Sequence, residues 1–375
     1  MAKGSSNVEV RIYNTQRIVN ALYLQGPMTK HDLAERLSLS PPTVSVILKE
    51  LTAKGLVAPG EKLKPVGGRP PTHIRIAFDS KVSIGVDVAQ AQVRIALVDL
   101  GPRMVAQAKY PLDASASADP WSQVHACIER FIAEHAVDPG KLLGVGLSVH
   151  VPIEDGVPRP PASEDASEVR APEWDFSRLR RELGHRLEIF NGAKMAGLAQ
   201  AWGIGDTHDF VYLMLDETVG GAVLSQRGLI DAGPKNAEFG HLPVAETSDV
   251  PCACGRRGCL DACCSARALR LRTGVEPEDF FARLDAGDAR FVAIWEEYLD
   301  RLATGVHALR MCYDRDVVLG GALSVPLAGR LDALRARLAR RNPFGDGGSY
   351  VRIAGFGEFD SAFGAALMHN DRYLS

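Results

Sequence analysis

The chain has 375 residues, a net charge of −3 and seven cysteines, which is an odd number. That length supports two or three domains with sizeable cores, and the composition indicates neither a membrane span nor the apolar core of a signal peptide. We therefore expect a cytoplasmic protein without a membrane partner and without a disulfide framework.

The charge is distributed unevenly along the chain. Residues 1–78 contain eleven Lys or Arg against five Asp or Glu, a balance of +6, whereas the remainder carries −9. A basic head on an acidic body is typical of a protein that presents one end to a polyanion. A merely solvated N-terminal face has the same charge pattern, so charge alone does not decide between the two.

The head predicts three helices. Apolar side chains in residues 14–24 lie on one helical face, and Gly26-Pro27 ends that helix. Thr29 is placed to cap a second helix over 30–37. A third helix starts at Pro41 or Pro42 and runs to about Lys54, because proline in the first turn costs no hydrogen bond.

Helix, short turn and helix together indicate a helix-turn-helix, whose second helix enters the major groove of double-stranded DNA. The side chains expected to face outward there, toward base edges or phosphates, are Pro42, Thr43, Ser45, Val46 and Lys49. A purely structural three-helix module is the alternative.

Two wing strands are expected at residues 56–57 and 74–78. The Gly68-Arg69-Pro70 run between them is narrow and extended, so Arg69 is a candidate for insertion into an A·T minor groove. A rigid Pro/Gly linker is the competing interpretation of this segment.

The body predicts alternating strands and helices, which indicates an α/β fold with a cleft between two lobes. Strands are expected at 84–88, 93–98, after Met104, and at 142–149, 187–190, 210–215, 219–225, 317–321 and 351–354. Helices are expected at 121–136, 192–202, about 265–311, 326–341 and from Phe359 onward.

Three cysteines gather in a glycine-rich loop. Cys252, Cys254 and Cys259 lie around two glycines, and the first of them follows His241 by eleven residues. Three thiolates and one imidazole form the closed tetrahedral set of a structural zinc ion, so we predict Zn²⁺ here. Cys263 and Cys264 follow closely, and core packing is the role expected for them.

Several runs together resemble transcriptional regulators of the ROK family, named after repressors, open reading frames and kinases. The runs are residues 14–18, 39–45, Gly68-Arg69-Pro70, 236–241, 252–262 and Gly320-Gly321. The resemblance implies a winged helix-turn-helix joined to an actin-like, hexokinase-like (RNase H-like) body. It implies a DNA-binding domain at 1–78, a first lobe at 79–190 joined by helix 357–375, and a second lobe with the zinc loop at 191–356.

Against the kinases of that family, this sequence departs at each catalytic position. Ala89 and Ala91 stand where the first phosphate turn has glycine and threonine, and Gly192 stands where the catalytic aspartate is expected. The next turn, which contains Asp216 and Glu217, presents two carboxylates that are expected to repel phosphates. We therefore expect no enzymatic activity.

The resemblance also implies a sugar pocket made of Asn191, Glu238, His241 and Asp261. Amides, carboxylates and imidazoles suit it because each makes directional hydrogen bonds to hydroxyl groups. Asp261 is one methylene shorter than the usual glutamate. His241 would serve both zinc and ligand. The room left at Gly192, with Lys194 nearby, hints at a sugar 6-phosphate or an extended glycan, and a Lys194 that is simply solvated on its helix is the alternative.

These features predict a sugar-responsive repressor of carbohydrate uptake or metabolism genes. It would bind a pseudo-palindromic operator as a homodimer, a tetramer being left open, and a sugar or sugar phosphate would change operator affinity. Two alternatives remain: an ATP-dependent sugar kinase of the same fold, and a body that docks a transport protein instead of a small ligand.

Overall fold

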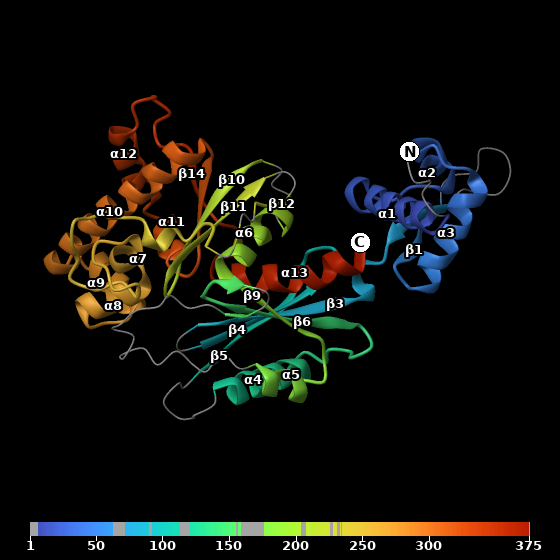
Figure 1. The fold of residues 1–375 in the computed structure, drawn as a ribbon, viewed down its shortest axis with the longest axis horizontal. Helices are drawn as coiled ribbons and strands as arrows, with labels where there is room; N and C mark the ends of the chain where they lie inside the picture. Colours follow the sequence, from blue (N-terminus) through green and yellow to red (C-terminus); the bar gives the residue numbers. More distant parts are fainter. Residues whose placement is uncertain are drawn as a thin grey trace.

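The computed structural model describes residues 7–62, 72–89, 92–112, 120–154, 157–158, 176–203, 208–225, 228–230, 233 and 235–374. Within these residues a small N-terminal head lies beside a larger body (Figure 1). The body has two five-stranded sheets, each forming the centre of one lobe. Helices α6 (Gly192–Gly203) and α13 (Asp360–Leu374) pack against each other between the two sheets.

The head contains the three predicted helices and a two-stranded wing. Helix α1 spans Asn7–Gln25, α2 Lys30–Leu37 and α3 Pro41–Ala53, while strands β1 (Val57–Lys62) and β2 (Thr72–Ile76) pair antiparallel. Apolar residues from all of these elements form one core. The three-helix arrangement and the wing strands are therefore confirmed.

Local side-chain chemistry sets the helix ends. The Thr29 hydroxyl accepts the N–H of Asp32, and the Asp32 carboxylate accepts the N–H of Thr29, which forms the capping box that starts α2. The predicted start of α1 at residue 14 is wrong, because the helix already begins at Asn7. Arg11, in these additional turns, pairs with Glu50 of α3, a contact between distant residues that a local pattern does not reveal.

The first lobe is built on a mixed sheet with the strand order β5-β4-β3-β6-β9. Its strands are β3 (Val82–Val88), β4 (Gln92–Asp99), β5 (Met104–Pro111), β6 (Leu142–Val149) and β9 (Leu187–Asn191). The first three strands are antiparallel, and β6 and β9 then add in parallel. Helices α4 (Pro120–Glu134) and α5 (Ser177–Glu182) cover one face.

The other face of this sheet is covered by the C-terminal helix α13. An ideal Cβ at Gly85 would lie 1.7 Å from the Ala362 carbonyl oxygen, and one at Gly146 would lie 2.3 Å from that of Ala365. Glycine is required at both strand positions because only it allows the helix backbone to approach so closely. The last helix of the chain therefore completes the core of the first lobe.

The second lobe has the strand order β12-β11-β10-β13-β14. Its strands are β10 (Phe210–Leu215), β11 (Val219–Ser225), β12 (Gly228–Leu229), β13 (Asp316–Gly320) and β14 (Val351–Ile353). Its helices, which pack on the face opposite α6, are α7 (Leu260–Cys264), α8 (Ala266–Thr273), α9 (Pro277–Asp285), α10 (Ala289–Tyr313), α11 (Ser324–Ala328) and α12 (Leu331–Arg341). The α/β fold with two lobes is confirmed.

The expected single helix at 326–341 is wrong. The chain forms α11 and α12, and the break falls at Gly329 and Arg330. Glycine lowers helix stability by about 1 kcal/mol relative to alanine, which favours a break at that point. The sequence also did not predict α5, β12 or the hairpin of β7 (Ile153–Glu154) and β8 (Val157–Pro158), whose few residues carry no clear periodicity.

The head packs directly on the first lobe. Leu100, Leu143, Tyr373 and Leu374 of the body join the apolar core of the head. The Tyr373 hydroxyl donates a hydrogen bond to the carbonyl of Lys54, which directly follows α3, at 3.2 Å. The C-terminal end of α13 therefore lies beside the head (Figure 1), in contact with the residue that follows α3.

Candidate functional site

The predicted metal ligands converge on one centre in the second lobe. His241, Cys252, Cys254 and Cys259 place their ligand atoms within 4.8 Å of one another. His241 ends the 3-10 helix η2 (Phe239–His241), and Cys259 directly precedes α7. No other group of potential metal ligands was found in the part of the chain that the structure describes.

The geometry and chemistry of these donors fit zinc. The Cys254 and Cys259 sulfurs lie 3.8 Å apart, and Cys252 Sγ lies 3.4 Å from His241 Nδ1. Zn–S bonds of about 2.3 Å in a tetrahedron require sulfur atoms about 3.8 Å apart. Cys264 is fully buried in the apolar core of the second lobe, as expected for a thiol that fills space.

The loop reaches this geometry through Gly258. Its φ of +80° is one that side chains rarely adopt, and an ideal Cβ there would lie 2.1 Å from the Ala245 carbonyl oxygen. The Gly258 carbonyl in turn accepts the N–H of Val244 at 2.9 Å. Glycine at this position lets the chain turn back so that Cys259 faces the other ligands.

Of the predicted pocket residues, Asn191 and Glu238 lie near the buried Lys194. Asn191 at the end of β9 donates to the Val151 carbonyl at 2.9 Å and accepts the N–H of Lys194 at 3.0 Å, so it also caps α6. Burial raises the pKa of the Glu238 carboxyl, and the charge of Lys194 opposes that shift. The Lys194 Nζ donates to the Gly233 carbonyl.

Asp261 is held by protein groups at both carboxylate oxygens. Its Oδ1 accepts the N–H of Val219 at 2.8 Å, and its Oδ2 accepts from Arg267 at 3.3 Å. The side chain thus joins α7 to β11. His241, in contrast, directs Nδ1 toward Cys252.

The space beside Gly192 is smaller than expected. An ideal Cβ at that position would lie 3.2 Å from Ser148 Oγ and 3.5 Å from both His150 Cε1 and Ser361 Oγ. The room that the sequence suggested for a larger group is therefore not found at this Cα. The surroundings are polar, and the fully buried Ser148 hydroxyl has no hydrogen-bond partner among the described residues.

His150 is a residue of this region that the sequence did not single out. Its Nε2 bonds Asp87 Oδ1 at 2.8 Å. Burial by itself lowers the pKa of His150, but the charge and hydrogen bond of Asp87 outweigh it, so the net shift is upward. His150 directly follows the parallel strand β6. Ligand-binding groups of α/β sheets gather at this edge, so the position of His150 in the sequence could have identified it as a candidate site residue.

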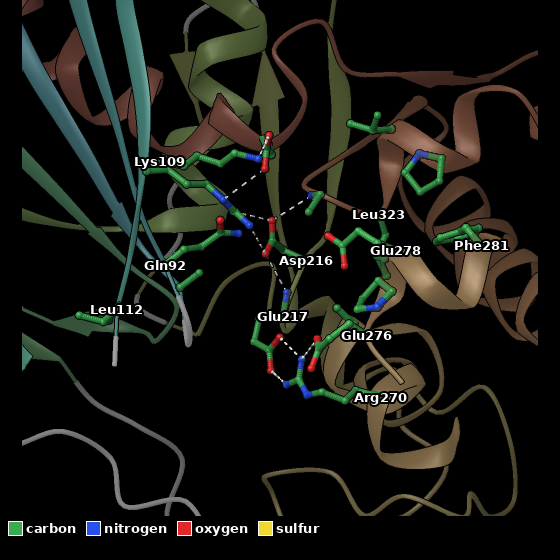
Figure 2. A pocket seen from close by; sticks show the side chains of 18 residues that line it. Gln92, Lys109, Leu112, Asp216, Glu217, Arg270, Glu276, Glu278, Phe281 and Leu323 are labelled. Carbon is green, nitrogen blue, oxygen red and sulfur yellow. Dashed lines mark hydrogen bonds and ion pairs between the residues drawn. The ribbon is translucent and has the colours of Figure 1, made fainter. Parts of the chain in front are cut away.

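A cavity of about 730 Å³ lies between the lobes, and several of its charged side chains pair with one another (Figure 2). Arg94 of β4 donates to both carboxylate oxygens of Asp216, at 2.9 and 3.3 Å, and to Asp87 at 3.2 Å. Lys109 of β5 bonds Glu358 at 2.8 Å.

The two carboxylates expected to repel phosphates do follow β10, and each is paired with an arginine. Glu217 pairs with Arg270, and Asp216 pairs with Arg94. The Asp216 carboxylate also accepts two backbone N–H groups, from Glu217 at 2.8 Å and from Ala322 at 2.9 Å. The N–H donors at the turns after β10 and β13 are thus already bonded to an anion of the protein itself.

The first turn of the cleft also differs from a phosphate loop. Ala89 closes the β3–β4 hairpin by donating its N–H to the Gln92 carbonyl at 3.0 Å, so this donor is satisfied within the hairpin. The predicted position Ala91 lies outside the described residues.

In the head, α3 exposes the side expected to face DNA. Pro42, Val46 and Lys49 are exposed, whereas Thr43 and Ser45 are half-buried. The Thr43 hydroxyl bonds that of Ser40, the N-cap of α3, at 2.8 Å, so part of its hydrogen-bonding capacity serves the cap. Arg69 lies outside the described residues.

Comparison with known proteins finds two matching family profiles. The profile described as ROK family matches residues 83–372, and one described as winged helix-turn-helix DNA-binding matches residues 13–58. A solved structure of a ROK family transcriptional regulator, described as a homologue of the Escherichia coli Mlc protein, superposes with a TM-score of 0.74. It is 17% identical and the match covers 97% of both chains, which shows a shared fold.

Curated relatives include both regulators and kinases. The DNA-binding transcriptional repressor Mlc of Escherichia coli is 23% identical over 269 residues, covering 70% of this chain and 65% of Mlc. The N-acetyl-D-glucosamine kinase of Yersinia pseudotuberculosis is 31% identical over 224 residues, covering 52% of this chain and 69% of the kinase. The match to Mlc thus spans just under two thirds of that protein. Among the described helices, none is both long and apolar enough to cross a membrane.

Proposed function

Because this chain belongs to the ROK family, we propose that it is a sugar-responsive transcriptional regulator that does not phosphorylate its ligand. Residues 1–78 bind the operator, and the two lobes bind a sugar or sugar phosphate. The regulated genes are those of carbohydrate uptake or metabolism, and repression is the proposed sign, as in the name of its relative Mlc.

The observation that carries the non-kinase part is the carboxylate of Asp216. It binds Arg94 and the N–H groups of Glu217 and Ala322, which are the kinds of donors a nucleotide phosphate would need. Glycine at position 192 supplies no general base, and loss of such a base typically lowers a rate about 10²–10⁴-fold. The relative named as a kinase keeps phosphorylation as the second candidate.

The proposed ligand site consists of Asn191, Glu238, His241 and Asp261. The proximity of Lys194 to Asn191 and Glu238 supports a polar ligand with several hydroxyl groups, and a sugar phosphate is compatible with that lysine. Asp261 is proposed in a supporting role, because its oxygens already bond Val219 and Arg267.

The proposed metal is structural zinc held by His241, Cys252, Cys254 and Cys259. Bound zinc would supply a rigid cross-link of the loop and would take part in no reaction. Because His241 belongs to both sets, the metal would fix the orientation of an imidazole that reaches the ligand.

The proposed DNA contacts are Pro42, Thr43, Ser45, Val46 and Lys49 in the major groove and Arg69 in the minor groove. Two copies in a dimer would present two such helices to a pseudo-palindromic operator. Ligand binding would change the cleft and thereby the placement of the heads, with a coupling of about 1–3 kcal/mol.

The test is a footprint on the DNA upstream of sugar-uptake genes, repeated with glucose, xylose, N-acetylglucosamine and its 6-phosphate. We expect a protected palindrome whose occupancy falls with one of these sugars. An ADP-release assay with the same sugars is run in parallel. Nucleotide turnover with any of them, or equal affinity for all duplex sequences, contradicts the proposal.

A further inference from the structure

Four charged side chains meet in the cavity, and the pair of Arg94 and Asp216 connects the two lobes. Arg94 and Lys109 lie on β4 and β5 of the first lobe. Asp216 follows β10 of the second lobe. Glu358 lies in the 3-10 helix η3 (Gly357–Phe359), where the chain passes from β14 of the second lobe to α13 of the first, so its pair with Lys109 holds this crossing segment. We propose that Arg94, Lys109, Asp216 and Glu358 form an ionic clasp that holds the lobes closed when no ligand is bound.

The Arg94–Asp216 pair forms the buried half of the clasp. The side chains of Arg94 and Asp216 are only 3% and 4% exposed, and the two N–H···O bonds at 2.9 and 3.3 Å are bidentate. Such charge-assisted pairs are roughly twice as strong as neutral hydrogen bonds and have a defined geometry. Lys109 and Glu358, 48% and 27% exposed, form the half that faces solvent. Figure 2 shows Lys109 and Asp216 reaching toward the cavity from opposite sides.

Each half of the buried pair also has partners within its own lobe. Arg94 keeps Asp87 of β3 at 3.2 Å, and Asp216 keeps the N–H groups of Glu217 and Ala322. Breaking a buried ion pair is very costly when it leaves an unpaired charge. Here separation of the lobes leaves both charges with a partner, so the clasp can open and close reversibly.

The same cavity contains a second group of paired charges, which does not connect the lobes. Arg270 of α8 bonds Glu217 and Glu276, and all three residues belong to the second lobe. Neutralising Arg270 changes the charge of the cavity without removing a link between the lobes. It is therefore a matched control for the clasp.

The clasp extends the proposed function by naming what keeps the cleft closed in the free protein. Asp87, which holds Arg94 with one oxygen, bonds His150 with the other, and His150 lies beside Gly192. A group that binds near Gly192 would thus act on the same hydrogen-bond network as the clasp.

The test uses the full chain without sugar or DNA. Arg94→Gln, Asp216→Asn and Lys109→Gln are compared with wild type and with Arg270→Gln by small-angle X-ray scattering and by amide hydrogen exchange. For the two variants of the buried pair, hydrogen exchange is measured on the opposite lobe: at residues 210–225 for Arg94→Gln and at residues 92–99 for Asp216→Asn. A hydrogen bond lost at the site of substitution is then not mistaken for opening of the lobes.

We expect a larger radius of gyration and about tenfold faster exchange on the opposite lobe for Arg94→Gln and Asp216→Asn, since one hydrogen bond to a charged group contributes about that factor. Lys109→Gln should show a smaller change in the same direction, and Arg270→Gln should match wild type.

One further variant, Arg94→Lys, and the Lys109→Gln variant already in the set keep the clasp testable if Arg94→Gln does not fold. Arg94→Lys retains the charge but loses the bidentate geometry, and should open partially, while the half-exposed Lys109 tolerates substitution. Scattering and exchange that are the same in the clasp variants as in Arg270→Gln overturn the clasp. Because the samples contain neither operator nor sugar, that outcome is independent of the footprinting result.

Discussion

The carboxylate of Asp216 binds three groups of the protein. It neutralises Arg94, and it accepts the backbone N–H groups that follow two parallel strands of the second sheet. An incoming phosphate would have to displace this carboxylate and leave it buried without partners, which costs more than the few hydrogen bonds gained. The identity of this one side chain therefore has a large effect on which ligands the cleft accepts.

A single ligand substitution tests the metal centre. We expect Cys254→Ser to lower bound zinc from about one ion per chain to nearly none, because a tetrahedral site needs four donors. The melting temperature should fall as well, since metal binding contributes to folding stability. Elemental analysis and calorimetry of the purified protein measure both effects.

Cys312→Ser is the matched control, because this cysteine is exposed and lies outside the cluster. It should leave the zinc content and the melting temperature unchanged. Retention of a full equivalent of zinc by Cys254→Ser would argue that another thiol, such as Cys263, is a ligand.

Asp360 at the start of α13 gives a pH-dependent stability. Burial raises the pKa of this carboxyl to about 7, although it accepts hydrogen bonds from Tyr212 at 2.5 Å, Gln200 and the N–H of Phe356. The folded state thus keeps a proton that the unfolded chain releases near pH 4. The stability gained is full below pH 4 and is lost as pH rises through 7, by at most about 1.4 kcal/mol per pH unit.

Asp360→Asn should remove this slope, because the amide does not titrate. Denaturant unfolding of both proteins at pH 5, 6, 7 and 8 measures it. The stability of wild type relative to the variant is expected to decrease over this range. Parallel pH profiles would mean that Asp360 is already ionised in the folded protein.

At the scale of elements, α3 is the helix proposed to contact DNA. Its buried side, Val44, Ile47, Leu48 and Leu51, packs into the head, so the residues between them face outward. Val46 is 53% exposed even though it is apolar, which is expected of a side chain that contacts a thymine methyl group.

Lys49→Ala tests the contact of α3 with phosphate. Loss of one phosphate contact should weaken binding to all duplexes alike and reduce the slope of log affinity against log salt by about 1. Fluorescence anisotropy at several salt concentrations measures this slope. Lys141→Ala, a change in the first lobe, is the control, and an unchanged slope in Lys49→Ala would place α3 away from the phosphates.

The fold and the site could be predicted from the sequence where the deciding contacts join residues close together in the chain. Caps such as Thr29, and cysteines spaced around glycines, act within a few residues, so the helices of the head and the metal cluster could be predicted. The pairing of Arg94 with Asp216 joins residues 122 positions apart, and no local pattern reports it. No local pattern reports the bonds of Asp261 to Val219 and Arg267 either, because these residues come from separate elements.

At the scale of the whole molecule, α13 connects regions that are distant in the sequence. Its first turn bonds the pocket region, where the Ser361 hydroxyl donates to the Gly192 carbonyl at 3.1 Å. Its middle packs on the first sheet, and Tyr373 near its end contacts the head. A displacement at one end of a rigid helix is carried to the other, so α13 is a direct physical connection between cleft and head.

Tyr373→Ala should loosen the head without disturbing the body. The ring packs against the core of the head and its hydroxyl bonds the Lys54 carbonyl, so its removal should cost about 1–3 kcal/mol. Hydrogen exchange of residues 41–58 should become faster, while zinc content remains that of wild type.

Tyr13→Ala is the comparison variant, because Tyr13 is a 61% exposed tyrosine of the same head. Equal exchange of residues 41–58 in the two variants would mean that the contact between Tyr373 and Lys54 does not hold the head in place.

The position of α13 also affects the order of events during synthesis. The strands of the first sheet are translated well before residues 360–374, so one face of that sheet stays uncovered until α13 is synthesised. A nascent chain can form its three N-terminal helices early, but it has no finished surface on which to seat them. Chains that are paused or truncated before residue 360 would therefore carry a folded N-terminal head that is not yet seated on the first lobe.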